Sequence, residues 1–219
     1  MTRQQYNNRL QELPVTLADM ATEVDRMLGQ AMQALADHNS ELAEIILRED
    51  DIVDELNVEI EHQCIDMIAL QQPVGRDLRL IGAAYNIVTD LERIGDHGVD
   101  IAKISRKLSL LSKDQTPEDL IRMSVLVRRM LKNLITALQT FDLCYTDTIV
   151  STEPEVNLAY RQFETTSYLS MDHAAPGNVE ASYLLFVAHH LEEIADHAVS
   201  VANRLRWCVT GQSVRKMAA

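Results

Sequence analysis

The amino-acid sequence predicts an all-α fold of six helices, arranged as two tandem, pseudo-symmetric three-helix bundles. Helix breakers are scarce, since the 219 residues include only 7 glycines and 5 prolines. Apolar residues recur at helical spacing, as in the stripe formed by Ile87, Leu91, Ile94, Gly98 and Ile101. The segment 90–99 also returns as 190–199, with Leu, Glu, Ile, Asp, His and Val matched position for position. This repetition indicates an internal duplication.

The first bundle is predicted within residues 1–113. Its first helix covers 14–37, and residues 3–13 extend it if Pro14 is a kink rather than a first-turn residue. Ser40 is a good N-cap for a second helix, which ends near Leu70 before Gln71-Gln72-Pro73 breaks the chain. A third helix is expected over 74–110.

The second bundle is predicted within residues 114–219. Thr116 is expected to cap the fourth helix, because Pro117 suits the first helical position that follows it. That helix is expected to end near Cys144. The fifth helix begins at Glu153-Pro154 and ends near Met171. Asn178 caps a sixth helix, which ends near Trp207.

Charge and cysteine content restrict the possible functions. The net charge of −13 predicts no nucleic-acid partner, because such a surface repels phosphates, and Arg128, Arg129 and Lys132 are expected on a solvated face. The three cysteines lack a CxxC pair, so Cys64 and Cys144 are expected as small buried hydrophobes in a reducing cytoplasm. Apolar runs are too short to cross a bilayer and no secretion signal is evident. Nucleotide-binding loops and a GxSxG motif are also missing from the sequence.

Acidic residues lie one helical turn apart at the margins of two apolar stripes. Asp50 and Asp54 flank the stripe of the second helix, while Glu92 and Asp96 flank that of the third, with Asp100 one turn further along. If the two helices pack antiparallel, the two pairs face each other across one groove. Carboxylates in that arrangement suit magnesium, calcium, manganese or iron, and zinc less well because it usually has nitrogen or sulfur ligands too.

The second half repeats the motif with differences. Glu192 and Asp196 have the same spacing on the sixth helix, but the fifth offers Glu153 and Asn157, one acid fewer. We therefore expect a weaker second site, or one that recruits His189. The alternative for all these residues is that they form solvated helix faces. For His97 and His197, a surface position or a satisfied hydrogen bond, as with Glu193, is favoured over a ligand role.

At these residues the sequence resembles the PhoU family of bacterial and archaeal phosphate-transport regulators. The resemblance covers nearly the whole chain, and its most specific parts are 72–80, with Gln72-Pro73 and Asp77-Leu78-Arg79, and the stretch 90–96. It implies two three-helix bundles with metal ions held on the acidic motifs Asp50, Asp54, Glu92, Asp96, Glu153, Glu192 and Asp196. The ions would be divalent or trivalent: iron, magnesium, manganese or zinc.

The resemblance also implies a function. The protein would restrain phosphate uptake by binding the ATPase of a phosphate ABC transporter, and would silence the starvation response through a sensor histidine kinase. It would be a cytoplasmic homodimer without catalytic activity or membrane insertion. Met20, Met27 and Met32 are possible dimer contacts, although core positions are the more usual role of such residues.

Two other functions fit parts of the sequence. A di-metal oxidase in a helical bundle requires Glu-x-x-His on two helices, and only Glu59 and His62 have that spacing. A metal-free helical adaptor requires only the amphipathic stripes.

Overall fold

Six long helices account for all the regular structure in the part of the chain that the computed structural model describes, residues 1–111, 115–170 and 178–212. The helices are α1 (Arg3–Ala36), α2 (Ser40–Gln71), α3 (Gly75–Leu111), α4 (Glu118–Thr140), α5 (Leu143–Ser170) and α6 (Asn178–Thr210). The all-α prediction of six helices is confirmed. The predicted boundary at 113/114 and most of the loop before Asn178 lie outside the described residues.

The helix caps differ from the predicted ones at two places. Asn39, not Ser40, caps α2, because its side chain accepts a hydrogen bond from the Leu42 amide at 3.0 Å. Pro117, not Thr116, is the N-cap residue of α4. The Thr116 hydroxyl instead donates to the Leu35 carbonyl at the end of α1, so it ties the linker to the first half.

The fifth helix was predicted to begin at Glu153, about ten residues too late, whereas the predicted end of the fourth helix near Cys144 is close to the observed end at Thr140. The break occurs at Phe141, which has a left-handed backbone with φ of 55°, and α5 begins at Leu143. The Asp142 carboxylate accepts a hydrogen bond from the Cys144 amide, which stabilises the new helix start. Pro154, taken as a helix start, lies inside α5, just as Pro14 lies inside α1. Proline at an interior position removes one backbone donor without ending these long, well-packed helices.

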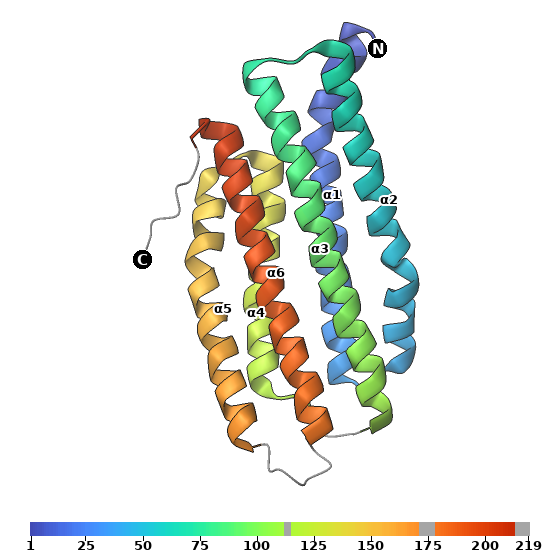
Figure 1. Ribbon diagram of the computed structural model, residues 1–219, viewed down its shortest axis with the longest axis vertical. Helices are drawn as coiled ribbons and strands as arrows, with labels where there is room; N and C mark the ends of the chain where they lie inside the picture. The colour runs from blue at the N-terminus through green and yellow to red at the C-terminus, as the bar shows by residue number, and fades with distance from the viewer. Residues whose placement is uncertain (112–114, 171–177, 213–219) are drawn as a thin grey trace.

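The two halves have the same arrangement of helices. In each half every helix packs against the other two, and the halves meet where α3 packs on α6 and α1 on α4. Figure 1 shows α3 and α6 side by side near the middle of the molecule, with α2 and α5 on the outer sides. The acidic motifs of both halves therefore lie on neighbouring helices: α2 with α3, and α5 with α6.

The buried apolar residues of both halves form one continuous core. The predicted α3 stripe is buried throughout, and so are Met20, Met27 and Met32, which contribute to the core and not to a dimer contact. Cys64 is buried as predicted, but Cys144 is exposed. None of the helices in the described ranges has the length and hydrophobicity needed to span a membrane.

The stretch 72–80 connects three helices at one end of the molecule. The chain turns from α2 into α3 through Gln72 and Gly75, both with positive φ. The Tyr6 hydroxyl of α1 then donates to Asp77 at 2.9 Å, and Arg79 Nε donates to the carbonyl of Cys208 in α6 at 3.3 Å. Within this stretch, which resembled a family signature, Asp77 therefore ties α3 to α1 inside the first half, and Arg79 ties α3 to the second half.

Candidate metal centre

Three carboxylates meet between α2 and α3. Asp50, Asp54 and Asp96 each place one oxygen within 4.8 Å of the other two. The close approach of the helices depends on Gly95, because a Cβ atom there would lie only 3.1 Å from Cγ1 of Val53. Gly95 and Val53 directly precede Asp96 and Asp54 in the chain. The close packing of Val53 on Gly95 thus brings Asp50 and Asp54 next to Asp96.

The electrostatics of this cluster favour a cation. Burial raises the pKa of Asp50, and repulsion from Asp54 and Asp96 raises it further. Burial and the charge of Asp96 likewise raise the pKa of Glu92, which lies beside the three. Arg93 offsets part of this charge, at 3.6 Å from Glu92 and 3.2 Å from Asp96. Carboxylate oxygens gathered at this spacing are suitable ligands for a hard cation.

The matching place between α5 and α6 has a mixed set of donors. Glu192 converges with His189 and Glu193, each offering one donor atom within 4.8 Å of the others. The sequence analysis expected His189 as an additional ligand of the metal site in this half. Glu153 accepts a hydrogen bond from Asn157 Nδ2 at 2.6 Å, and the charge of Glu153 contributes to the raised pKa of Glu192, after burial and Asp196. The Asn157 Oδ1 atom is buried and has no hydrogen-bond partner among the described residues, so one more oxygen donor is available.

A third cluster, of histidines, lies where α3 meets α6. The Nδ1 atoms of His97 and His190 are 3.0 Å apart, and His197 Nδ1 lies 3.0 Å from the Asp90 carboxylate. Of the two alternatives expected for His97 and His197, a surface position or a satisfied hydrogen bond, the structure has the second: both are partly buried and paired, and the partner of His197 is Asp90 and not Glu193. Burial lowers the pKa of His97, and it lowers that of His190 to about 4.

Asp90 is a buried polar residue that sequence reasoning did not single out. It accepts hydrogen bonds from His197, Ser200 Oγ at 2.9 Å and Arg204 Nε at 2.8 Å, all on α6. Burial tends to raise its pKa, but these three hydrogen bonds outweigh burial and lower it. The sequence held a signal, since Asp90 falls between Ile87 and Ile94 at the spacing of the core stripe.

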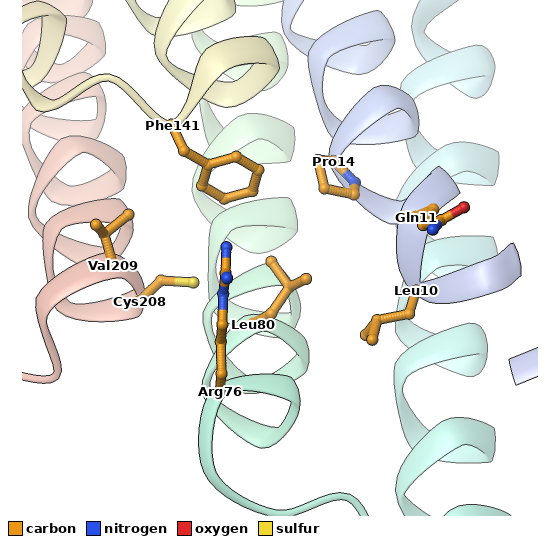
Figure 2. Close-up of a pocket in the computed structure, with 8 residues that line it drawn as sticks. All are labelled: Leu10, Gln11, Pro14, Arg76, Leu80, Phe141, Cys208 and Val209. Carbon is orange, nitrogen blue, oxygen red and sulfur yellow. The ribbon is translucent and has the colours of Figure 1, made fainter. Parts of the chain in front are cut away.

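A cavity of about 540 Å³ lies between the halves at the end of the molecule where the stretch 72–80 begins α3. Figure 2 shows its lining, which is largely apolar apart from Arg76 and Gln11, with Phe141, Leu80 and Cys208 around the space. Burial raises the pKa of the Cys208 thiol, which disfavours the nucleophilic thiolate. The lining therefore does not resemble a catalytic site.

The oxidase alternative is not favoured by the positions of its two candidate ligands. Glu59 and His62 are both exposed on α2, and Glu59 accepts a hydrogen bond from Gln63 at 3.0 Å. Ligands of di-metal oxidases project into the core of a helical bundle. This pair faces the solvent instead.

Comparisons with known proteins agree with the duplicated fold. The PhoU domain family matches twice, over residues 17–105 and 120–205. The phosphate-specific transport system accessory protein PhoU homolog of Clostridium acetobutylicum is 32% identical over 217 residues, 98% of each chain. The homolog of the same name from Aquifex aeolicus is 35% identical over 189 residues, 84% of this chain and 83% of that one.

Solved structures show the same architecture. The crystal structure of the phosphate transport system regulatory protein PhoU from Streptococcus pneumoniae superposes with a TM-score of 0.85 at 27% identity, covering 96% of this chain and 99% of that one. PhoU from Pseudomonas aeruginosa also gives a TM-score of 0.85, at 25% identity, covering 94% of this chain and all of that one. Sequence and fold agree over both halves, and the chain belongs to the PhoU family.

Proposed function

We propose that this protein is a regulator of phosphate uptake and of the phosphate-starvation response. The match of both halves to the PhoU domain carries the proposal, together with relatives along almost the full chain that are named accessory proteins of phosphate-specific transport. The protein acts in the cytoplasm by binding the ATPase of a phosphate ABC transporter and a sensor histidine kinase. It works by association, as a homodimer without catalytic activity of its own.

Metal ions held on the acidic motifs belong to the same proposal. Asp50, Asp54 and Asp96 converge, with Glu92 beside them, and an oxygen-only set of this kind suits magnesium, manganese or iron better than zinc. In the second half, Glu192 with His189 offers a nitrogen donor, while Glu153, Asn157 and Asp196 are the other members of the repeated motif. The two centres therefore differ in ligand type and in affinity.

The metal is proposed to shape a docking surface. Without a cation, the carboxylates of α2 and α3 repel one another, and this repulsion adds to the effect of burial in raising the pKa of Asp50. A bound ion removes that repulsion and fixes the side chains between the two helices. Partner proteins then meet an ordered surface on α2 and α3.

A genetic test distinguishes the regulatory role from a bare scaffold. The gene is deleted in its host and complemented with wild type, with Glu92→Gln/Asp96→Asn, or with the control Asp51→Asn, whose carboxylate is exposed and outside the converging set. We expect a starvation-inducible phosphatase reporter to be silent in phosphate-rich medium with wild type and control, and active with the double variant. Equal silence in all three strains would count against a role for the metal motif, and silence in the deletion strain would count against the regulatory proposal.

The partners are tested by affinity capture from phosphate-replete cells, followed by mass spectrometry. The proposal expects a transporter ATPase and a sensor kinase to be enriched with wild type over a mock capture. Enrichment of neither protein would contradict it. Light scattering of the purified protein checks the expected homodimer.

A further inference from the structure

A group of histidines joins the two halves at a place that the proposed regulatory function does not use. His97 lies on α3, whereas His190, Glu193 and His197 lie on α6, and these two helices form the main contact between the halves. The ring centroids of His97 and His197 are 5.8 Å apart, and those of His97 and His190 are 5.2 Å apart. This cluster lies between α3 and α6, whereas the acidic motifs lie between α2 and α3 and between α5 and α6.

Three of these side chains converge as a set of metal donors. His97, Glu193 and His197 each offer one ligand atom, and these atoms lie within 4.8 Å of one another. All three side chains are partly buried. Two imidazoles and one carboxylate resemble the ligand sets that hold zinc and related ions, with one or more positions left for water.

The surroundings of His197 support a ligand role. Its Nδ1 atom faces Asp90 at 3.0 Å, and Asp90 is itself held by Ser200 and Arg204. Metal-binding histidines usually donate one ring N–H to a carboxylate, which fixes the tautomer and leaves the other nitrogen for the metal. This arrangement assigns the proton to Nδ1 of His197 and the lone pair to Nε2.

The surroundings of His97 also support a ligand role. Its Nδ1 atom is engaged with His190 Nδ1 at 3.0 Å, so its Nε2 atom is the nitrogen that remains for a ligand. The alternative set of His97, Asp100 and His190 also converges. In that set, however, Lys103 Nζ donates a hydrogen bond to Asp100 Oδ1 at 2.8 Å, and the two histidines are hydrogen-bonded to each other. The set with Glu193 and His197 is therefore the better site.

We propose that His97, Glu193 and His197 bind one zinc-like transition-metal ion where α3 packs on α6. The ion links the two halves of the protein through side chains from both. The site is separate from the oxygen-rich cluster of Asp50, Asp54 and Asp96, and its nitrogen donors select a softer metal than that cluster does.

The test uses the full chain, freed of any affinity tag and stripped of metal with a chelator. Cobalt(II) is the probe, because it substitutes for zinc and its visible absorption becomes stronger in a site of low coordination number. Zinc affinity is then measured by competition with the cobalt signal. The variants are His97→Gln and Glu193→Gln, with His62→Gln as the control, because His62 is an exposed histidine on α2 outside the converging sets of donors. Helicity and the metal-free melting temperature confirm that each variant is folded.

We expect wild type, His62→Gln and the acidic-motif variant Glu92→Gln/Asp96→Asn to show the cobalt band. His97→Gln and Glu193→Gln should lose it and bind zinc at least about 10-fold more weakly, since even outer-shell changes cost about 10- to 100-fold in affinity. A folded His97→Gln that keeps the band and binds zinc as wild type does would overturn the site. A wild-type protein without the band would do the same.

The outcome does not depend on the proposed regulatory function. His97 and His197 lie outside the acidic motifs, although Glu193 also converges with His189 and Glu192. Loss of phosphate control without loss of the cobalt band, or loss of the band in His97→Gln without loss of phosphate control, therefore separates the two proposals.

Discussion

Asp25 of α1 and Arg128 of α4 form a two-pronged ion pair across the boundary between the halves. Arg128 Nε donates to Asp25 Oδ1 at 2.8 Å, and its second nitrogen donates to Oδ2 at 2.9 Å. Asp25 is only 8% exposed, and the carboxylate raises the pKa of Arg128. The sequence placed Arg128 on a solvated face, but the arginine is used to hold α1 against α4.

Replacing Asp25 by alanine should therefore destabilise the fold. Hydrogen bonds to charged groups contribute about 1.5 to 3 kcal/mol, and the partial exposure of Arg128 places the expected loss near about 2 kcal/mol. Urea unfolding of wild type and variant measures it. Glu44→Gln is the control, because the Glu44–Arg106 pair is exposed on both sides and its loss should leave stability unchanged. Equal effects of the two substitutions would contradict the assignment.

Gly29 provides an independent check of the same pair. A Cβ atom at Gly29 would lie 2.8 Å from Cζ of Arg128, so an alanine there displaces the guanidinium. Alanine also favours a helix over glycine by about 1 kcal/mol. In an Arg128→Ala background Gly29→Ala should stabilise the protein by about that amount, whereas in wild type the gain should disappear or reverse. A double-mutant cycle measures the difference, and identical effects in both backgrounds would show that Gly29 and Arg128 are not coupled.

The extent to which sequence predicted the fold depends on the kind of signal. Helical periodicity identified the six helices and the buried α3 stripe, because burial of one helix face needs only the spacing of apolar residues. Helix ends were less well predicted. Phe141 ends α4 in a left-handed conformation that glycine usually adopts, so no glycine marked the end, and the prolines at positions 14 and 154 are interior.

The candidate site residues were also predicted only in part. The acid pairs of α2 and α3 were found from their spacing on single helices, and the close contact at Gly95 brings them together. The histidine cluster was missed because its members lie about a hundred residues apart, and spacing along one helix carries no information about the α3–α6 contact. Asp90, an acid within an apolar stripe, was the signal in the sequence that this contact is partly polar.

Tyr6 should give the protein a dependence on alkaline pH. Burial and the hydrogen bond to Asp77 raise its pKa to about 12, above the value of 10 for an exposed tyrosine. The stabilisation is therefore fully present below pH 10 and is lost as the pH rises toward 12, because the unfolded chain releases the phenol proton first. The advantage of wild type over Tyr6→Phe should shrink by about 1 to 2 kcal/mol between pH 8 and pH 11.5. Urea unfolding at both pH values measures it, and a constant difference would contradict the role of this phenol.

Asp50→Asn should change stability in opposite directions with and without metal. In chelator, the substitution removes repulsion with Asp54 and Asp96, and neutralising one such carboxylate should stabilise the protein by about 0.5 kcal/mol. With manganese or magnesium present, wild type gains the free energy of binding, about 2.7 kcal/mol when the ion is at 100 times its Kd, and the variant gains less. The melting temperatures of wild type and variant should therefore exchange order when metal is added.

Asp51→Asn is the matched control, since Asp51 is the next residue along α2 and is exposed outside the converging carboxylates. If Asp50→Asn and Asp51→Asn respond to metal alike, the acids between α2 and α3 are a solvated face and not a cation site.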